Sequence, residues 1–328
     1  MKYASLSTLI LIFLSLSCSK TDYSAFTEPG ISAALAEQRA ATISELSYEL
    51  FFDIPETQNE GIPANLTLRL NLSDTQTPLI LDFRTDSLQI SGIFADSQAI
   101  DYQIVNDHIL IPSRYLKTGE NEFYLAFVAG EQSLNRNEAY LYTLLVPDRA
   151  STLFPCFDQP DLKAKFGLSL SIPNHWKAVC NGAELRREAR GDKTYIEFAF
   201  SRPISTYIFA FAAGELQQST AERDGRTMHM YYRENDAAKV QRNEAAIFDL
   251  HAAALSWLEE YTGIPYPFEK FDFAMFPTFQ YGGMEHPGAI FYREQSLMLD
   301  EGATQNQYLG RASLIAHETA HMWFGDLV

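Results

Sequence analysis

Alternating apolar residues between about residues 47 and 215 limit the possible folds of this chain more than any other feature. The alternation is clearest in three runs, Leu66 to Leu72, Phe166 to Ile172 and Ile196 to Phe200. Successive side chains of a strand point to opposite faces of a sheet, so such runs predict strands that bury one face. Turn sequences such as NDH, KTGEN and RGDK separate the runs. We therefore expect an N-terminal antiparallel β domain over 47–215, either a β-sandwich or a saddle-shaped sheet.

The spacing of apolar residues changes after residue 215. Residues 237–262 carry apolar side chains three and four positions apart, which predicts an amphipathic helix that ends before Gly263. An aromatic segment around Gly282 and Gly283 predicts strands, and a last helix is predicted at about 306–324. We expect a second domain of mixed α and β structure over 216–328.

The first residues have the pattern of an export signal. One lysine precedes an apolar run from Leu9 to Leu14, which is too short to span a bilayer stably, and small residues follow up to Cys18. We predict a signal peptide at 1–17, and its end resembles a bacterial lipoprotein signal in which Cys18 is lipidated. An ordinary signal peptide with an incidental cysteine is the alternative. Residues 18–46 are expected to form a tether and a short helix, and the protein is expected in the bacterial cell envelope.

Charge and cysteine content limit the partners. The chain has 42 acidic and 25 basic residues and a net charge of −17, which disfavours nucleic acid and anionic membrane surfaces as partners. We expect contact with a membrane only through the lipid anchor. Two further cysteines, Cys156 and Cys180, could form a disulfide in an oxidising compartment, but buried free thiols are an equal alternative.

The segment HETAH near residue 320 predicts a metal site. His317 and His321 are four residues apart, so on a helix they project from one face and can bind one ion together. Glu318 lies between them, where a carboxylate could take the proton of a water activated by zinc. The alternative is two histidines packed in a core helix, but burying an unpaired carboxylate beside them is costly. We predict one Zn²⁺ bound by the two histidines, with Glu318 as the general base.

A second motif, GGMEH, lies upstream at 282–286. Gly282 and Gly283 leave the backbone uncovered, so a peptide could pair with it as an added strand. Glu285 follows with a carboxylate that, close to a zinc site, would select the positively charged free amine of a peptide. Taken alone, without the HETAH segment, this stretch would favour a β-bulge at the glycines and a solvated turn at Glu285.

Together, the two motifs resemble those of the M1 family of zinc aminopeptidases, the aminopeptidase N relatives within the gluzincin group. The family signature G-x-M-E-N stands here as GGMEH, and the zinc signature stands as HETAH followed by MWFGDLV. The segments FPCFDQPDLKAKF at 154–166, STYIFAFAAGEL at 205–216 and YTGIPYPFEKFD at 261–272 resemble the family as well. The likeness therefore covers about residues 45–328.

This resemblance implies a thermolysin-like α+β zinc peptidase domain and a role for each matching residue. His317 and His321 would bind zinc, Glu318 would be the general base, and Glu285 would hold the α-amine of the substrate. The implied substrates are peptides with a free N-terminus, from which the first residue is hydrolysed. The other signature residues would line the cleft and contact the peptide backbone: Gly282, Gly283 and Met284.

The sequence departs from the family pattern at His286 and in the stretch TLLVPDRAST, which has no glutamine or glutamate to provide the second amine contact that many family members carry. His286 stands in place of the asparagine of the signature, and an imidazole would add a pH-dependent charge near Glu285. In the family, a glutamate as third zinc ligand and a tyrosine that stabilises the tetrahedral intermediate lie further along the chain than Val328. We therefore expect an N-terminal portion of a longer peptidase, inactive by itself because zinc normally needs three protein ligands. Its last apolar residues are expected to be exposed: Met322, Trp323 and Phe324.

Two other functions remain open at this stage. A zinc endopeptidase could use the same helix motif, although an amine held by Glu285 would restrict cleavage to chain ends. A non-catalytic surface lipoprotein could bind peptides through its β domain and carry a vestigial zinc site.

Overall fold

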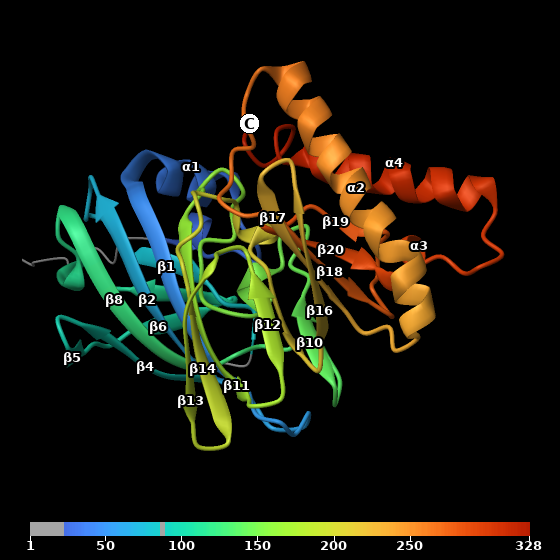
Figure 1. Ribbon diagram of the computed structural model, residues 1–328. Helices are drawn as coiled ribbons and strands as arrows, with labels where there is room; N and C mark the ends of the chain where they lie inside the picture. The colour runs from blue at the N-terminus through green and yellow to red at the C-terminus, as the bar shows by residue number, and fades with distance from the viewer. Residues whose placement is uncertain (1–22, 86–88) are drawn as a thin grey trace, which may run out of the picture.

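The computed structural model describes residues 23–85 and 89–328, so the predicted signal peptide and Cys18 lie outside the described residues. Strands up to Gly214 form three sheets, and strands from Gln217 onward form a fourth sheet that carries the two longest helices (Figure 1). The prediction of a mainly β N-terminal region followed by a region with helices is confirmed. Within the described part, no helix has the length and apolarity needed to cross a membrane.

The largest sheet has eight strands in the order β13-β14-β11-β1-β2-β8-β4-β5. Its alternating strands bury one face, as in β2, whose four leucines are at most 4% exposed. In this order the strands are β13 (Glu184–Arg190), β14 (Lys193–Phe198), β11 (Lys165–Pro173), β1 (Ile43–Asp53), β2 (Pro63–Leu72), β8 (Gly119–Val128), β4 (Ile90–Ala95) and β5 (Gln98–Ala99).

The expectation of a purely antiparallel domain is wrong at one strand pair. β1 and β11 run parallel, from Ser47 opposite Lys165 to Asp53 opposite Ser171. Parallel neighbours need a long connection, and here the chain between the two strands builds most of the rest of the domain. Alternation of apolar residues is the same in both arrangements, so the sequence pattern did not distinguish them.

Two smaller sheets complete this domain and share one apolar core with the large sheet. They are a four-stranded sheet of β12 (Lys177–Cys180), β15 (Phe211–Gly214), β10 (Tyr140–Thr143) and β9 (Leu134–Arg136), and a three-stranded sheet of β3 (Leu79–Asp82), β7 (His108–Ile111) and β6 (Gln103–Val105). The 3-10 helix η1 (Ser24–Phe26) precedes the first strand, and other short 3-10 helices connect strands: η3 (Ser113–Tyr115), η4 (Ala150–Thr152) and η5 (Thr206–Ile208). Cys156 and Cys180 are both free and buried.

The described N-terminal residues dock onto the β domain. Helix α1 (Ala33–Thr42) starts at a Ser32 cap and ends four residues before the predicted helix end, because Ile43 already begins β1. Arg39 is buried and binds Asp82 with two hydrogen bonds of 2.9 and 2.7 Å. A charged side chain is accommodated in a core when a side chain of opposite charge is buried beside it and hydrogen-bonded to it.

His108 joins the segment before α1 to the same carboxylate. Its Nδ1 lies 2.9 Å from Asp82 Oδ1, and its Nε2 lies 2.9 Å from the Glu28 carbonyl and 3.0 Å from the Gly30 carbonyl. Burial opposes a charge on His108, but the hydrogen bonds to Asp82 and Glu28 outweigh burial and raise its pKa. Because every partner is an acceptor, the protonated ring with two N–H donors fits this position best.

We expect the attachment of residues 23–32 to weaken at alkaline pH. A pKa raised by folding gives a stabilisation that is complete below the unfolded-state value of about 6.5 and is lost as pH rises through the folded-state pKa. Backbone hydrogen exchange of residues 23–32, corrected for intrinsic rates, should be less protected at about pH 9 than at about pH 6. His108→Gln should abolish this difference, whereas His175→Gln, at an exposed histidine, should keep it. Equal protection of the wild type at both pH values would contradict the assignment.

The second region is built on a five-stranded sheet in the order β16-β17-β18-β20-β19. Parallel pairs join β17 to β18 and β18 to β20, and β19 pairs antiparallel with β20 as an edge strand. Its strands are β16 (Gln217–Arg223), β17 (Arg226–Tyr232), β18 (Asp272–Phe276), β20 (Ala289–Arg293) and β19 (Gly283–Met284). Its helices are α2 (Ala237–Thr262), α3 (Glu294–Leu297) and α4 (Gln305–His321).

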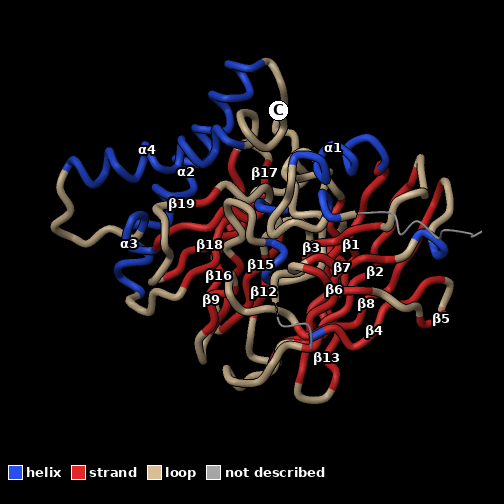
Figure 2. Tube along the Cα trace, turned by 180° about the vertical axis from the view of Figure 1, so that it is seen from behind, coloured by secondary structure: helices blue, strands red, loops and turns tan. Residues whose placement is uncertain are grey.

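The helices α2, α3 and α4 gather on one side of the molecule, and the remainder is mainly strand and loop, as Figure 2 shows. The predicted helix over 237–262 has the predicted bounds, and Gly263 follows with a φ of 67° in the left-handed region. An apolar core joins these helices to the five-stranded sheet and includes Met228 of β17, Ile247 of α2 and Ile315 of α4. A capping box at Thr304 begins α4.

The expectation that Met322 and Trp323 are exposed is wrong. They are 0% and 2% exposed, because the chain turns after α4 and packs against the segment that follows α2. The Trp323 indole donates a hydrogen bond of 3.0 Å to the Ile264 carbonyl, and its ring meets the Tyr266 ring edge to face. Phe324, in contrast, is 53% exposed.

Candidate metal and peptide site

Helix α4 places the two predicted metal ligands side by side. The Nε2 atoms of His317 and His321 lie 3.2 Å apart. Two nitrogens bound to one tetrahedral zinc at the usual bond length are separated by about 3.3 Å, so this spacing fits a shared ion. The His321 Nδ1 lies 3.2 Å from the Phe324 carbonyl, and a hydrogen bond donated there leaves Nε2 free for a metal.

Buried polar contacts hold α4 in place at its other end. The Arg311 guanidinium donates a hydrogen bond of 2.8 Å to Asn243 Oδ1 on α2, and another to the Leu297 carbonyl of α3. Asn243 in turn donates to the Leu299 carbonyl. These contacts join α4 to α2 and α3, and further along the helix the Glu318 side chain lies against Gly283 of β19.

Glu285 and Glu318 approach the histidines from two elements. Glu285 directly follows β19, Glu318 lies on α4, and possible ligand atoms of Glu285, Glu318 and His321 all lie within 4.8 Å of one another. His317 is outside this group but adjoins it through His321. The structure therefore brings together the predicted metal ligands, general base and amine anchor. Imidazole nitrogens and carboxylate oxygens are ligands that zinc prefers, so the donor types at this site fit a zinc ion.

Gly283 allows this approach. A Cβ atom at Gly283 would lie 2.6 Å from the Cγ, Cδ and Oε1 atoms of Glu318, closer than real Cβ contacts. β19 pairs with β20 in regular register, Gly283 opposite Tyr292, and its other edge is unpaired within the described sheet. An extended peptide could therefore add to the free edge of β19 beside the carboxylates.

The surroundings of the other two signature residues, Gly282 and Met284, differ from those of Gly283. A Cβ at Gly282 would meet only Leu314, at 3.2 Å. The Met284 side chain is 4% exposed and belongs to the apolar core of the β domain, so only its backbone can face a cleft.

The carboxylates of this site lack compensating positive charge. Among the described residues, neither Glu285 nor Glu318 forms an ion pair with a lysine or an arginine. Burial, and then the charge of Glu285, raise the pKa of Glu318 to about 8. Two carboxylates that share a small space repel each other, and a bound cation removes that penalty. The site is therefore electrostatically suited to a metal ion and to an ammonium group.

A third acidic group at this site, Asp326, was not predicted from the sequence. Asp326 is 2% exposed, and within the described chain both of its carboxylate oxygens lack a hydrogen-bond partner. Burial, and then the charge of Glu285, raise its pKa to about 9, although the positive charge of Lys163 acts to lower it. Lys163 Nζ donates a hydrogen bond of 2.8 Å to the Asp326 backbone carbonyl.

The hydroxyl of Tyr207, a residue of the β domain, is also affected by the charges of this site. Burial, and then the charges of Asp326 and Glu285, raise its pKa to about 12, so its hydroxyl stays protonated at neutral pH. Lys163 and Tyr207 lie far from α4 in the sequence and belong to no metal motif. No spacing rule could have identified them, because only the packing of the two domains brings them near.

The expectation of a pH-dependent charge at His286 is wrong. The ring is fully buried, packs edge to face on Phe291 at 4.8 Å, and both nitrogens lack hydrogen-bond partners among the described residues. Burial lowers its pKa to about 3. The imidazole is therefore neutral at physiological pH, and its ring packs in the core as an apolar group would.

Substituting Gly283 should disturb the site more than substituting its neighbour. Gly283→Ala forces Glu318 to move and should lower the free energy of unfolding by about 1–3 kcal/mol, the range for overpacking. Gly282→Ala meets only the end of the flexible Leu314 side chain and should change it by about 0.5 kcal/mol or less. Denaturant unfolding of both variants measures the difference. Equal stabilities would show that Glu318 is not confined by Gly283.

Both regions of the chain are similar to known protein families. The model of the Peptidase M1 N-terminal domain matches residues 44–208, and the model of the Peptidase family M1 domain matches residues 247–328. Aminopeptidase N of Streptomyces lividans is 31% identical over 313 residues, which cover 89% of this chain and 35% of the relative.

Two further relatives agree with these matches. Probable aminopeptidase 1 of Sulfurisphaera tokodaii is 28% identical over 292 residues, 86% of this chain and 35% of the relative. Puromycin-sensitive aminopeptidase of Caenorhabditis elegans is 37% identical over 179 residues, 53% of this chain and 18% of the relative. The chain thus spans about a third or less of the length of these relatives.

Proposed function

Because this chain belongs to peptidase family M1, we propose that the protein is a zinc-dependent aminopeptidase that hydrolyses the first residue from peptides. The observation that carries the proposal is the convergence of Glu285 and Glu318 on His321, beside His317. The curated relatives are named as aminopeptidases, which agrees with it.

The residues divide the chemistry among them. His317 and His321 would hold one zinc ion, with a further carboxylate of the whole protein as third ligand. When bound, zinc supplies a Lewis acid that lowers the pKa of a water molecule. Glu318 would accept the proton of that water and pass it to the leaving amine, since it lies between the two histidines on α4.

Glu285 would decide which bond is cleaved. An ammonium group paired with Glu285 sits within a few ångströms of the carboxylate of Glu318, so only the first peptide bond would reach the reacting centre. The peptide backbone would pair with the free edge of β19. The negative charge of Glu285, which pairs with no lysine or arginine among the described residues, supports selection of a free amine over an acetylated one.

The finer fold and location belong to the same proposal. We infer that 216–328 begins a thermolysin-like α+β domain, supported by α4 beside the edge of a five-stranded sheet. A β-sandwich or saddle is proposed for the N-terminal domain, whose three sheets share one core. Export to the bacterial envelope with Cys18 lipidated is supported by the first eighteen residues, and the net charge of −17 disfavours nucleic acid.

In the full-length protein, Glu318→Gln should retain zinc and lose activity. The amide keeps the size of the side chain but cannot accept the proton, so turnover of an aminoacyl amide should fall by at least about 10²-fold. Metal analysis and steady-state kinetics on the same sample test both parts. Glu260→Gln, on the surface of α2, is the matched control and should change neither. Turnover unchanged in Glu318→Gln would exclude it as the general base.

Glu285→Ala should weaken the requirement for a free amine. The wild type should cleave free but not N-acetylated peptides. In the variant, mainly the KM for the free peptide should rise, because the ion pair with the ammonium group is lost. Equal cleavage of both peptides by the wild type would favour a zinc endopeptidase. Peptide binding without zinc and without cleavage would favour a binding lipoprotein.

A further inference from the structure

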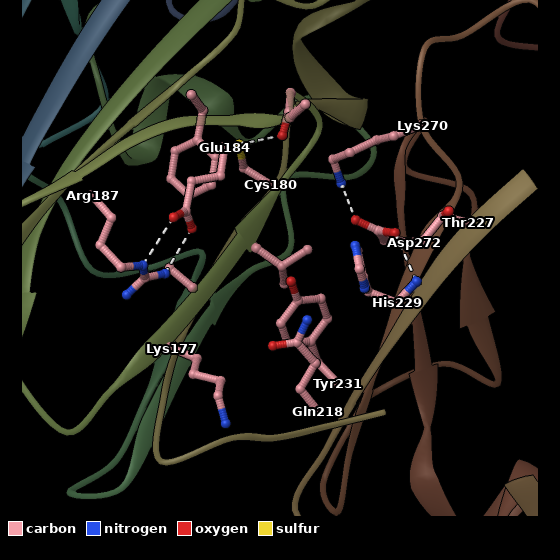
Figure 3. Close-up of a pocket in the computed structure, with 15 residues that line it drawn as sticks. Lys177, Cys180, Glu184, Arg187, Gln218, Thr227, His229, Tyr231, Lys270 and Asp272 are labelled. Carbon is pink, nitrogen blue, oxygen red and sulfur yellow. Dashed lines mark hydrogen bonds and ion pairs between the residues drawn. The ribbon is translucent and has the colours of Figure 1, made fainter. Parts of the chain in front are cut away.

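A cavity of 680 Å³ lies between the β domain and the five-stranded sheet, and none of His317, Glu318, His321 and Glu285 lines it (Figure 3). Cavities of this size at domain junctions are typical places for small-molecule ligands, for which about 300–1,000 Å³ is common. The cavity is therefore separate from the proposed peptidase site, and its lining determines what it could bind.

Polar side chains of β17 form one wall. Thr227, His229 and Tyr231 line the cavity, whereas the alternating Met228 and Met230 are fully buried in the core beneath the helices. This alternation follows from strand geometry, which sends successive side chains to opposite faces. One face of β17 thus stabilises the fold, and the other presents hydrogen-bonding groups to the cavity.

The charged residues of the lining are only partly neutralised. Figure 3 shows two ion pairs on opposite sides: Arg187 donates two hydrogen bonds of 2.9 and 2.7 Å to Glu184, and Lys270 donates one of 2.9 Å to Asp272. Lys177 donates to the Leu216 carbonyl at 3.1 Å and pairs with no carboxylate in the described part. Three cations against two carboxylates leave one positive charge here, in a chain whose net charge is −17.

Hydrogen-bond donors of the lining are also free. Within the described chain the Tyr231 hydroxyl has no hydrogen-bond partner, and His229 uses only Nδ1, at 2.8 Å from Thr220 Oγ1. Burial raises the pKa of Tyr231, so its hydroxyl remains a donor at neutral pH. Free donors and an excess cation favour a ligand rich in acceptor oxygens.

We propose that this interdomain cavity binds a small organic anion through carboxylate or phosphate oxygens, with Tyr231, His229 and Lys177 as its recognition groups. The proposal does not depend on peptidase activity, because the cavity has a lining of its own. The walls come from both domains, with Lys177 on β12 and Tyr231 on β17, so a bound anion would also join the domains.

Calorimetric titration of the full-length protein at low salt tests the proposal. Succinate and inorganic phosphate serve as the carboxylate and phosphate probes, and glycerol serves as the neutral probe. We expect saturable binding of at least one anion and none of glycerol. Tyr231→Phe and Lys177→Met should each weaken binding about tenfold, the loss expected for one hydrogen bond to a charged group.

Matched variants separate this cavity from other anion sites. Tyr261→Phe, at an exposed tyrosine of α2, and Lys165→Met, at an exposed lysine of β11, should bind as the wild type does. Binding of succinate alone assigns a carboxylate ligand, binding of phosphate alone assigns a phosphate ligand, and binding of both assigns their shared oxyanion chemistry. Absence of saturable binding, or binding that neither Tyr231→Phe nor Lys177→Met weakens, would overturn the proposal.

Discussion

The close approach of β19 to α4 at Gly283 and Glu318 is the contact on which the geometry of the site depends. The absence of a side chain at Gly283 lets the Glu318 carboxylate lie against the strand, and Glu285 follows two residues later. The strand edge that could bind a peptide is thereby fixed next to the helix that carries the histidines. A side chain at Gly283 would force the Glu318 carboxylate to move away from the strand.

The chemistry-bearing residues were predictable because their spacing has a local cause. His317 and His321 are neighbours on any helix, and Gly283 and Glu285 are close on any strand, so both motifs keep their meaning in different folds. The helix over 237–262 was predictable for the same reason, since its periodicity and the following Gly263 are local signals. These features could be predicted because residues close in the sequence determine them.

The features that sequence analysis missed or misjudged are all set by residues distant in the chain. The parallel pairing of β1 with β11, the burial of Trp323 and the apolar role of His286 each depend on segments that come together only in the folded domain. Asp326 was not predicted because a carboxylate outside any motif is usually solvated, and its burial follows from packing against the β domain.

The β domain contributes to the electrostatics of the site as well as to its support. Lys163 donates to the backbone after α4, and Tyr207 lies in the field of Asp326 and Glu285. Glu285, Glu318 and Asp326 meet where the domains join, and burial together with the charge of Glu285 raises the pKa of Glu318 to about 8 and that of Asp326 to about 9. A metal ion and a substrate ammonium group would each favour the ionised form of these carboxylates. The contact between the domains is thus itself a determinant of how strongly the site attracts cations.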